Sequence, residues 1–96
     1  MISDEKLEWV KKLLVKWSLM KENSLKLYIK QLPLSNIQRE IIALYFIQNN
    51  HKTYNFKEIE FKLNKSHDYV MKHYKKSLQI ILDYLPTFIF LNFPED

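Results

Sequence analysis

Five lysines between residues 62 and 76 form the strongest concentration of positive charge in this sequence. They are Lys62, Lys65, Lys72, Lys75 and Lys76, and five positive charges against Asp68 alone give a local charge of +4. Ammonium groups in such a cluster pair with phosphates, so the stretch favours a polyanionic partner. The net charge of the whole chain is also +4, but it is weaker evidence for such a partner than the local cluster. All its basic residues except Arg39 are lysines, and the chain is also rich in Asn, Ile and Tyr. This mixture is typical of proteins encoded by AT-rich genomes, so part of the lysine content reflects codon usage.

Other kinds of chemistry find little support in the residue types. Glycine and cysteine are absent, which excludes glycine-rich phosphate loops, disulfides and thiolate metal sites. His67 and His73 lie six residues apart and would face different sides of a helix, so they do not make a zinc site. Glu58 and Glu60 suit helix-start and surface positions better than a catalytic pair. We therefore expect no enzyme, no cofactor and no metal.

The length and composition indicate one globular domain over residues 1–96. Hydrophobic residues make up 47% of the chain, enough for a packed core. Acidic residues near Met1 argue against a signal peptide, and the longest apolar runs, 41–47 and 86–91, are too short to cross a bilayer. The sequence thus predicts a cytoplasmic protein with no membrane partner.

Periodic apolar residues predict helices in the first third, residues 1–32. Ser3 is placed to cap a first helix that ends near Met20, and residues 21–24 are interpreted as a connector to a short helix over 25–32. The core-facing residues expected on these two helices are Leu7, Val10, Leu13, Leu14, Trp17, Met20, Leu25, Tyr28, Ile29 and Leu32, with Trp9 at the flank. Both tryptophans are assigned to the core.

Helix-start signals divide the next part, residues 33–85, into three more helices. Pro33 ends the preceding helix, and Ser35 with Gln38 forms a capping box. Asn55 and Glu58 form a second one. Asn64 suits the left-handed conformation of a turn. Ser66 caps a long last helix, which Pro86 is expected to close. The inward residues expected on that helix are Val70, Tyr74, Leu78, Ile81, Leu82 and Leu85.

The remaining residues, 86–96, form a tail that is apolar and aromatic from Thr87 to Phe93. Such a patch is larger than a monomer usually exposes. Either the tail folds back on the first helix, or the apolar residues from Leu7 to Met20 and from Thr87 to Phe93 meet across a two-fold axis. A homodimer is the interpretation preferred here, because a second half-site increases the affinity of a DNA-binding helix pair.

The fold class expected is all-α, with about five helices and a helix-turn-helix in the second half. Its two helices follow Asn55 and Ser66, with Ile59 and Val70 as inward anchors. The stretch from Asn55 to Leu78 resembles, without gaps, region 4 of bacterial sigma-70-type factors. The similarity rests on Glu58, Ile59, Leu63, Ser66, Val70 and Leu78, and upstream on Leu32, Pro33, Gln38, Arg39, Glu40, Ile41, Ile42, Leu44, Tyr45 and Phe46. The chain looks most like the sigma-like late-gene activators of phages, of the RinA and ArpU type.

Two residues depart from the family's pattern. Glu60 stands where a small residue usually packs against the second helix, and Lys65 stands where the turn is usually apolar. Both side chains are long enough to reach solvent from such positions.

The resemblance implies that the helix of residues 66–82 enters the major groove of double-stranded DNA. The residues then expected at base edges are His67, Asp68, Met71 and Lys72, and those expected at phosphates are Lys62, Lys65, Lys75 and Lys76. The resemblance further implies a sequence-specific or semi-specific transcriptional regulator of phage or mobile-element origin, acting in a bacterial or phage-infected cell. The alternative is a protein-interaction module that binds RNA polymerase, or another regulator, without reading DNA.

Overall fold

The computed structural model describes residues 4–47 and 53–92, with side chains through residue 85, and these residues form five α-helices and no strand. The helices are α1 (Asp4–Met20), α2 (Glu22–Gln31), α3 (Asn36–Phe46), α4 (Phe56–Leu63) and α5 (His67–Asn92). The prediction of an all-α fold with about five helices is confirmed. Ser3, most of the polar segment after α3 and the end of the tail lie outside the described residues.

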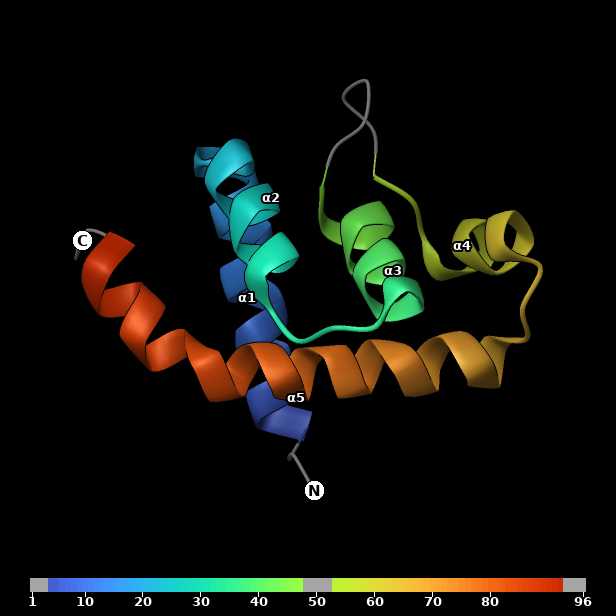
Figure 1. Cartoon of the computed structure of the whole chain (residues 1–96). Coiled ribbons are helices and arrows are strands. Elements are labelled where there is room, and N and C mark those ends of the chain that lie inside the picture. Colours follow the sequence, from blue (N-terminus) through green and yellow to red (C-terminus); the bar gives the residue numbers. More distant parts are fainter. Residues whose placement is uncertain (1–3, 48–52, 93–96) are drawn as a thin grey trace.

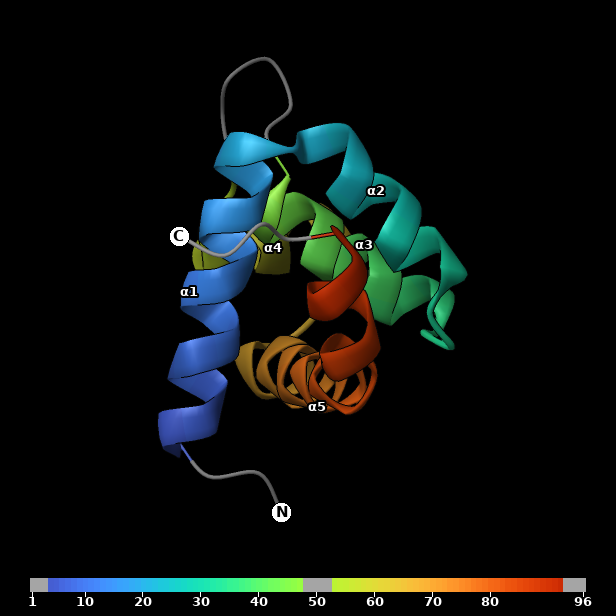
Figure 2. The ribbon, with the colours of Figure 1, turned by 90° about the vertical axis from the view of Figure 1, so that its left-hand side faces the viewer.

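The long helix α5 is the element around which the others are arranged. Helices α1, α3 and α4 each pack against it, while α2 packs against α1 and α3 (Figure 1). Turned by 90°, the view shows α1 and α2 side by side and α5 nearly end-on (Figure 2). The fully buried side chains of Leu14, Ile41, Ile59 and Leu78 come from four different helices and meet in one core.

Hydrogen bonds at the starts of α3 and α4 confirm both capping boxes. Ser35 Oγ accepts from Gln38 N at 3.2 Å, while Gln38 Oε1 accepts from Ser35 N at 2.9 Å. Asn55 Oδ1 accepts from Glu58 N at 2.9 Å, and Glu58 Oε1 accepts from Asn55 N at 3.1 Å. Each box satisfies backbone donors that the first helical turn leaves unpaired.

The turn between α4 and α5 has only three residues, 64–66. Asn64 has φ 55° and ψ 49°, the left-handed conformation expected for it. Ser66 Oγ accepts from Tyr69 N at 3.2 Å, so Ser66 caps α5 as predicted. Ile59 and Val70, the two expected anchors, are both fully buried. Helices α4 and α5 are therefore closely packed in spite of Glu60 and Lys65.

The expected connector over 21–24 is wrong, because Lys21 alone separates α1 from α2. Lys21 N donates to Trp17 O at 2.7 Å, and Leu25 N donates to Lys21 O at 3.1 Å. The first bond closes α1 and the second opens α2, so the break is confined to Lys21, which has φ −146° and ψ 66°. Glu22 suits the positive end of the new helix.

The buried face of α1 is narrower than expected. Val10, Leu14 and Trp17 are buried, whereas Trp9 is 50% exposed and Met20 52% exposed. The assignment of Trp9 and Met20 to the core is therefore wrong. At 100° per residue these two side chains point about a quarter turn away from the buried three, beyond the arc that the other helices cover.

The prediction that Pro86 ends the last helix is also wrong, since α5 continues to Asn92. Proline removes one backbone donor and crowds the carbonyl of Leu82, which bends a helix without always ending it. The helix changes direction toward its C-terminal end in Figure 1. The first residues of the expected tail thus belong to α5, but their side chains, and hence a clasp or dimer contact through them, lie outside the described residues.

Candidate nucleic-acid interface

The five clustered lysines lie at the end of α4, in the turn and on the first turns of α5. Their side chains are all exposed: Lys62, Lys65, Lys72, Lys75 and Lys76. His67 and Asp68, which open α5, are exposed as well. Met71 differs from the other residues expected at base edges, because it is half-buried and packs against the core. The fold thus brings seven of the eight candidate residues to the surface, with Met71 only partly accessible.

Two of these lysines lie over aromatic rings. Lys62 Nζ is 5.4 Å from the centre of the Tyr54 ring, and Lys65 Nζ is 5.0 Å from that of Tyr69. Cation–π contacts at exposed positions contribute about 0.5–1 kcal/mol, which biases a side chain without fixing it. The rings therefore hold both ammonium groups near the turn while leaving them free to move onto a phosphate.

Glu60, at the position where the resemblance led us to expect a small residue, contacts the first residue of α5. Its Oε2 is 2.7 Å from His67 Nδ1, and the two side chains are 21% and 62% exposed respectively. The contact spans the turn and links the two helices through polar groups. Sequence reasoning did not assign Glu60 to the site. The sequence signal for this contact was an acidic residue and a histidine on either side of a short turn.

His73 lies on the flank of α5 rather than on its outward face. Its ring packs against that of Tyr69, with centroids 4.4 Å apart. Burial lowers the pKa of His73, and the positive charges of Lys76 and Lys72 lower it further. The depressed pKa favours a neutral ring, so the positive charge of this surface comes from the lysines.

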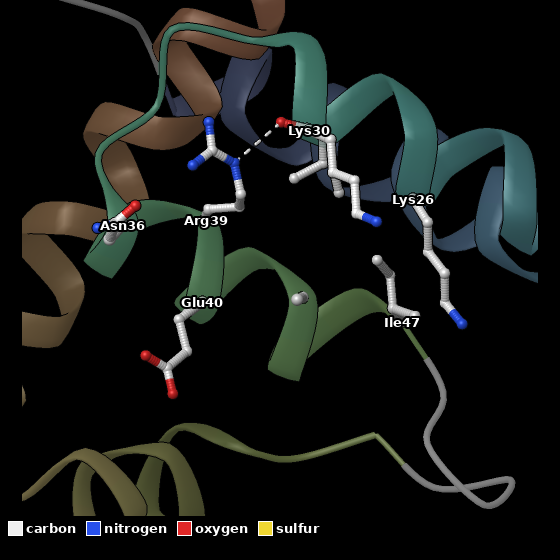
Figure 3. Close-up of a pocket in the computed structure, with 8 residues that line it drawn as sticks. Lys26, Lys30, Asn36, Arg39, Glu40 and Ile47 are labelled. Carbon is white, nitrogen blue, oxygen red and sulfur yellow. Dashed lines mark hydrogen bonds between the residues drawn. The ribbon is translucent and has the colours of Figure 1, made fainter.

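A hollow of about 380 Å³ lies away from this surface, between α2 and α3 (Figure 3). Ile29, Ala43 and Ile47 line it with apolar groups, and Lys26 and Lys30 border it. Among the described residues no three His, Cys, Asp or Glu side chains gather closely enough to hold a metal ion. The exposed lysine surface is therefore the best candidate site in the described part of the chain.

Comparisons of the chain with models of known families, with curated proteins and with solved structures return no match. Within residues 4–47 and 53–92, no helix combines the length and apolar character needed to cross a membrane. What the protein does must therefore be inferred from its own residues.

Proposed function

We propose that the protein is a double-stranded DNA-binding transcriptional regulator, with the helix of residues 66–82 in the major groove. The supporting observation is the placement of five exposed lysines around a three-residue turn between two packed helices. This is the arrangement by which a helix-turn-helix presents the start of its second helix to base edges. The proposal includes a relationship to sigma region 4-like regulators of phages or mobile elements, carried by the residues from Asn55 to Leu78.

The length of the first part of α5 is comparable with the width of a major groove. From His67 to Lys76 the helix advances about 13 Å at 1.5 Å per residue, and the groove is about 12 Å wide. Lys62 and Lys65 precede the residues expected at base edges, and Lys75 and Lys76 follow them. Phosphates on both sides of the groove would then be neutralised, with His67, Asp68 and Lys72 between them.

Sequence discrimination by this helix should be modest. The chain has no arginine on α5, so the forked donor that best recognises guanine is missing. The half-buried Met71 leaves fewer side chains free to reach a base. A semi-specific regulator, or one that gains selectivity from a second copy or a partner, fits this set of residues best.

Binding of a labelled duplex at increasing salt tests the proposal. The protein should bind both AT-rich and random duplexes at low salt, and its affinity should fall steeply as salt rises, because phosphate contacts release counterions. A duplex affinity too weak to measure at about 50 mM salt would contradict DNA binding. The single strand of the same sequence is the matched control, since a groove-reading helix requires a duplex.

A protein-interaction role is the second candidate, and Phe61 favours it. This side chain is 90% exposed on α4, between the exposed Lys57 and Lys62. An exposed aromatic with flanking lysines would suit an apolar, acidic surface on RNA polymerase or another regulator. Retention of host polymerase by the wild-type protein, lost in Phe61→Ala while duplex affinity is unchanged, would establish this role beside DNA binding.

Homodimerisation is also part of the proposal. Because Val10, Leu14 and Trp17 are buried within the chain, a contact through α1 has to use its exposed apolar residues, Trp9, Val15, Leu19 and Met20. Light scattering at tens of micromolar should give twice the 11.8 kDa chain mass. A monomeric mass there would exclude the dimer.

A further inference from the structure

The contact between Glu60 and His67 determines which hydrogen-bonding group His67 can present to DNA. With Glu60 ionised, its carboxylate can only accept, and a hydrogen bond at 2.7 Å then requires the hydrogen on Nδ1 of the ring. In the neutral ring, Nε2 then carries a lone pair and no hydrogen. The two nitrogens lie on different edges of the imidazole, so Nε2 is directed away from Glu60.

We propose that Glu60 is a positioning residue that makes His67 a hydrogen-bond acceptor for a base in the major groove. This inference rests on the proposed function and specifies its selectivity. The donors that base edges offer in the major groove are the exocyclic amino groups, N4 of cytosine and N6 of adenine. With its ring neutral, His67 therefore selects a base that carries an amino group, and disfavours guanine and thymine on the strand that it contacts.

The neighbouring residues support the same selectivity. Asp68 is exposed next to His67 at the start of α5 and is also an acceptor. The side chain of Glu60 is mostly buried, at 21% exposure, so it reaches His67 from the helix contact and does not compete for the base itself. The family's usual small residue at this position could not hold the ring.

The first test measures the histidine tautomer in the protein without DNA. Nitrogen-15 NMR of the His67 ring at about pH 8 should show the hydrogen on Nδ1 in the wild type. In Glu60→Ala the ring should move toward the Nε2-protonated form, because its acceptor is gone. Glu40→Ala, which removes an exposed carboxylate from α3, is the matched control and should leave the His67 signals unchanged. A wild-type ring protonated on Nε2 would overturn the inference whatever the protein binds.

The second test selects bound duplexes from a pool with randomised positions. The wild type and Glu40→Ala should enrich cytosine or adenine at one position, and Glu60→Ala and His67→Ala should both lose that enrichment. Affinity for unselected duplex should change less than about threefold in Glu60→Ala, since the lysines remain. Enrichment that survives in Glu60→Ala, or a wild type that enriches no base at a position lost in His67→Ala, would overturn the inference. Complete absence of duplex binding would instead refute the proposed function, and with it the recognition of a base by His67. The measured tautomer of His67 would still hold in that case.

Discussion

Arg39 donates from Nη2 to the carbonyl oxygen of Leu32 at 3.1 Å, so the chain's only arginine holds the end of α2. Its Nε also donates to Ile29 O at 3.4 Å (Figure 3). Ile29 lies in the last turn of α2 and Leu32 is the C-cap residue, and their carbonyl oxygens also accept from Leu32 N and Leu34 N respectively. Arg39 thus adds charged donors at this helix end, where a cation also suits the helix dipole. Arg39, which belongs to the expected resemblance to sigma region 4, thus has a structural role in this fold.

Replacing Arg39 by alanine should destabilise the fold. Loss of charged hydrogen bonds to two partly buried carbonyls should lower the free energy of unfolding by about 1.5–3 kcal/mol. Chemical denaturation followed by circular dichroism measures the change. Lys30→Ala, at an exposed position in the last turn of α2, is the control and should cost less than about 0.5 kcal/mol. Equal losses in the two variants would show that the Arg39 contacts add no stability.

Charge reversal at Lys72 and Lys75 should weaken DNA binding without changing the fold. Both side chains are exposed, so the helical circular dichroism of Lys72→Glu/Lys75→Glu should match that of the wild type. The log–log slope of affinity against salt should flatten by about 2, because two phosphate contacts are lost. Lys26→Glu/Lys30→Glu makes the same change of charge on α2. An equal effect from both pairs would mean that net charge, and not this surface, governs binding.

The contact between α4 and α5 should not tolerate a charge. Ile59 is fully buried, so Ile59→Asp should cost several kcal/mol, a large part of the stability of a domain of this size. Phe61→Asp introduces the same aspartate two residues along α4, at a position that is 90% exposed. Thermal melting should therefore show an unfolded or strongly destabilised Ile59→Asp beside a folded Phe61→Asp. Similar melting temperatures would contradict the packing of α4 described above.

Alkaline pH should unfold the protein partly through Tyr28. Burial raises the pKa of Tyr28 from 10.0 to about 12, with the nearby Tyr84 adding to the shift. The protonated phenol is thus favoured in the fold. Its stabilisation is fully present below pH 10, where the unfolded chain is also protonated, and is lost as pH rises from about 10 to about 12. Denaturation across this window should give a shallower pH dependence for Tyr28→Phe, and an unchanged dependence would refute the assignment.

Local signals made most of the fold predictable from sequence. Both capping boxes, the left-handed Asn64 and the Ser66 cap depend on residues within four positions of each other, and all appear as expected. The errors concern properties that neighbours in space decide. Whether Pro86 ends or only bends a helix depends on the rest of α5, and whether Trp9 is buried depends on how far other helices extend over α1.

The candidate site was predictable in its charge but not in its polar contacts. Spacing alone places Lys72 and Lys75 on the outward face of α5, opposite Val70. By contrast, Glu60 is oriented by the three-residue turn, which brings His67 within hydrogen-bonding distance of a residue seven positions earlier. The expected resemblance marked Glu60 only as an unusual residue, whereas the structure gives it a partner, His67.

The extent of α5 also sets the order in which the protein can fold during synthesis. This helix packs against α1, α3 and α4, and its Leu78, Ile81 and Leu85 are core residues. The apolar surfaces of α1, α3 and α4 that pack against α5 therefore stay uncovered until the chain through Leu85 has left the ribosome. Those surfaces would then be open to chaperones, so the domain should complete its folding only after Leu85 has emerged.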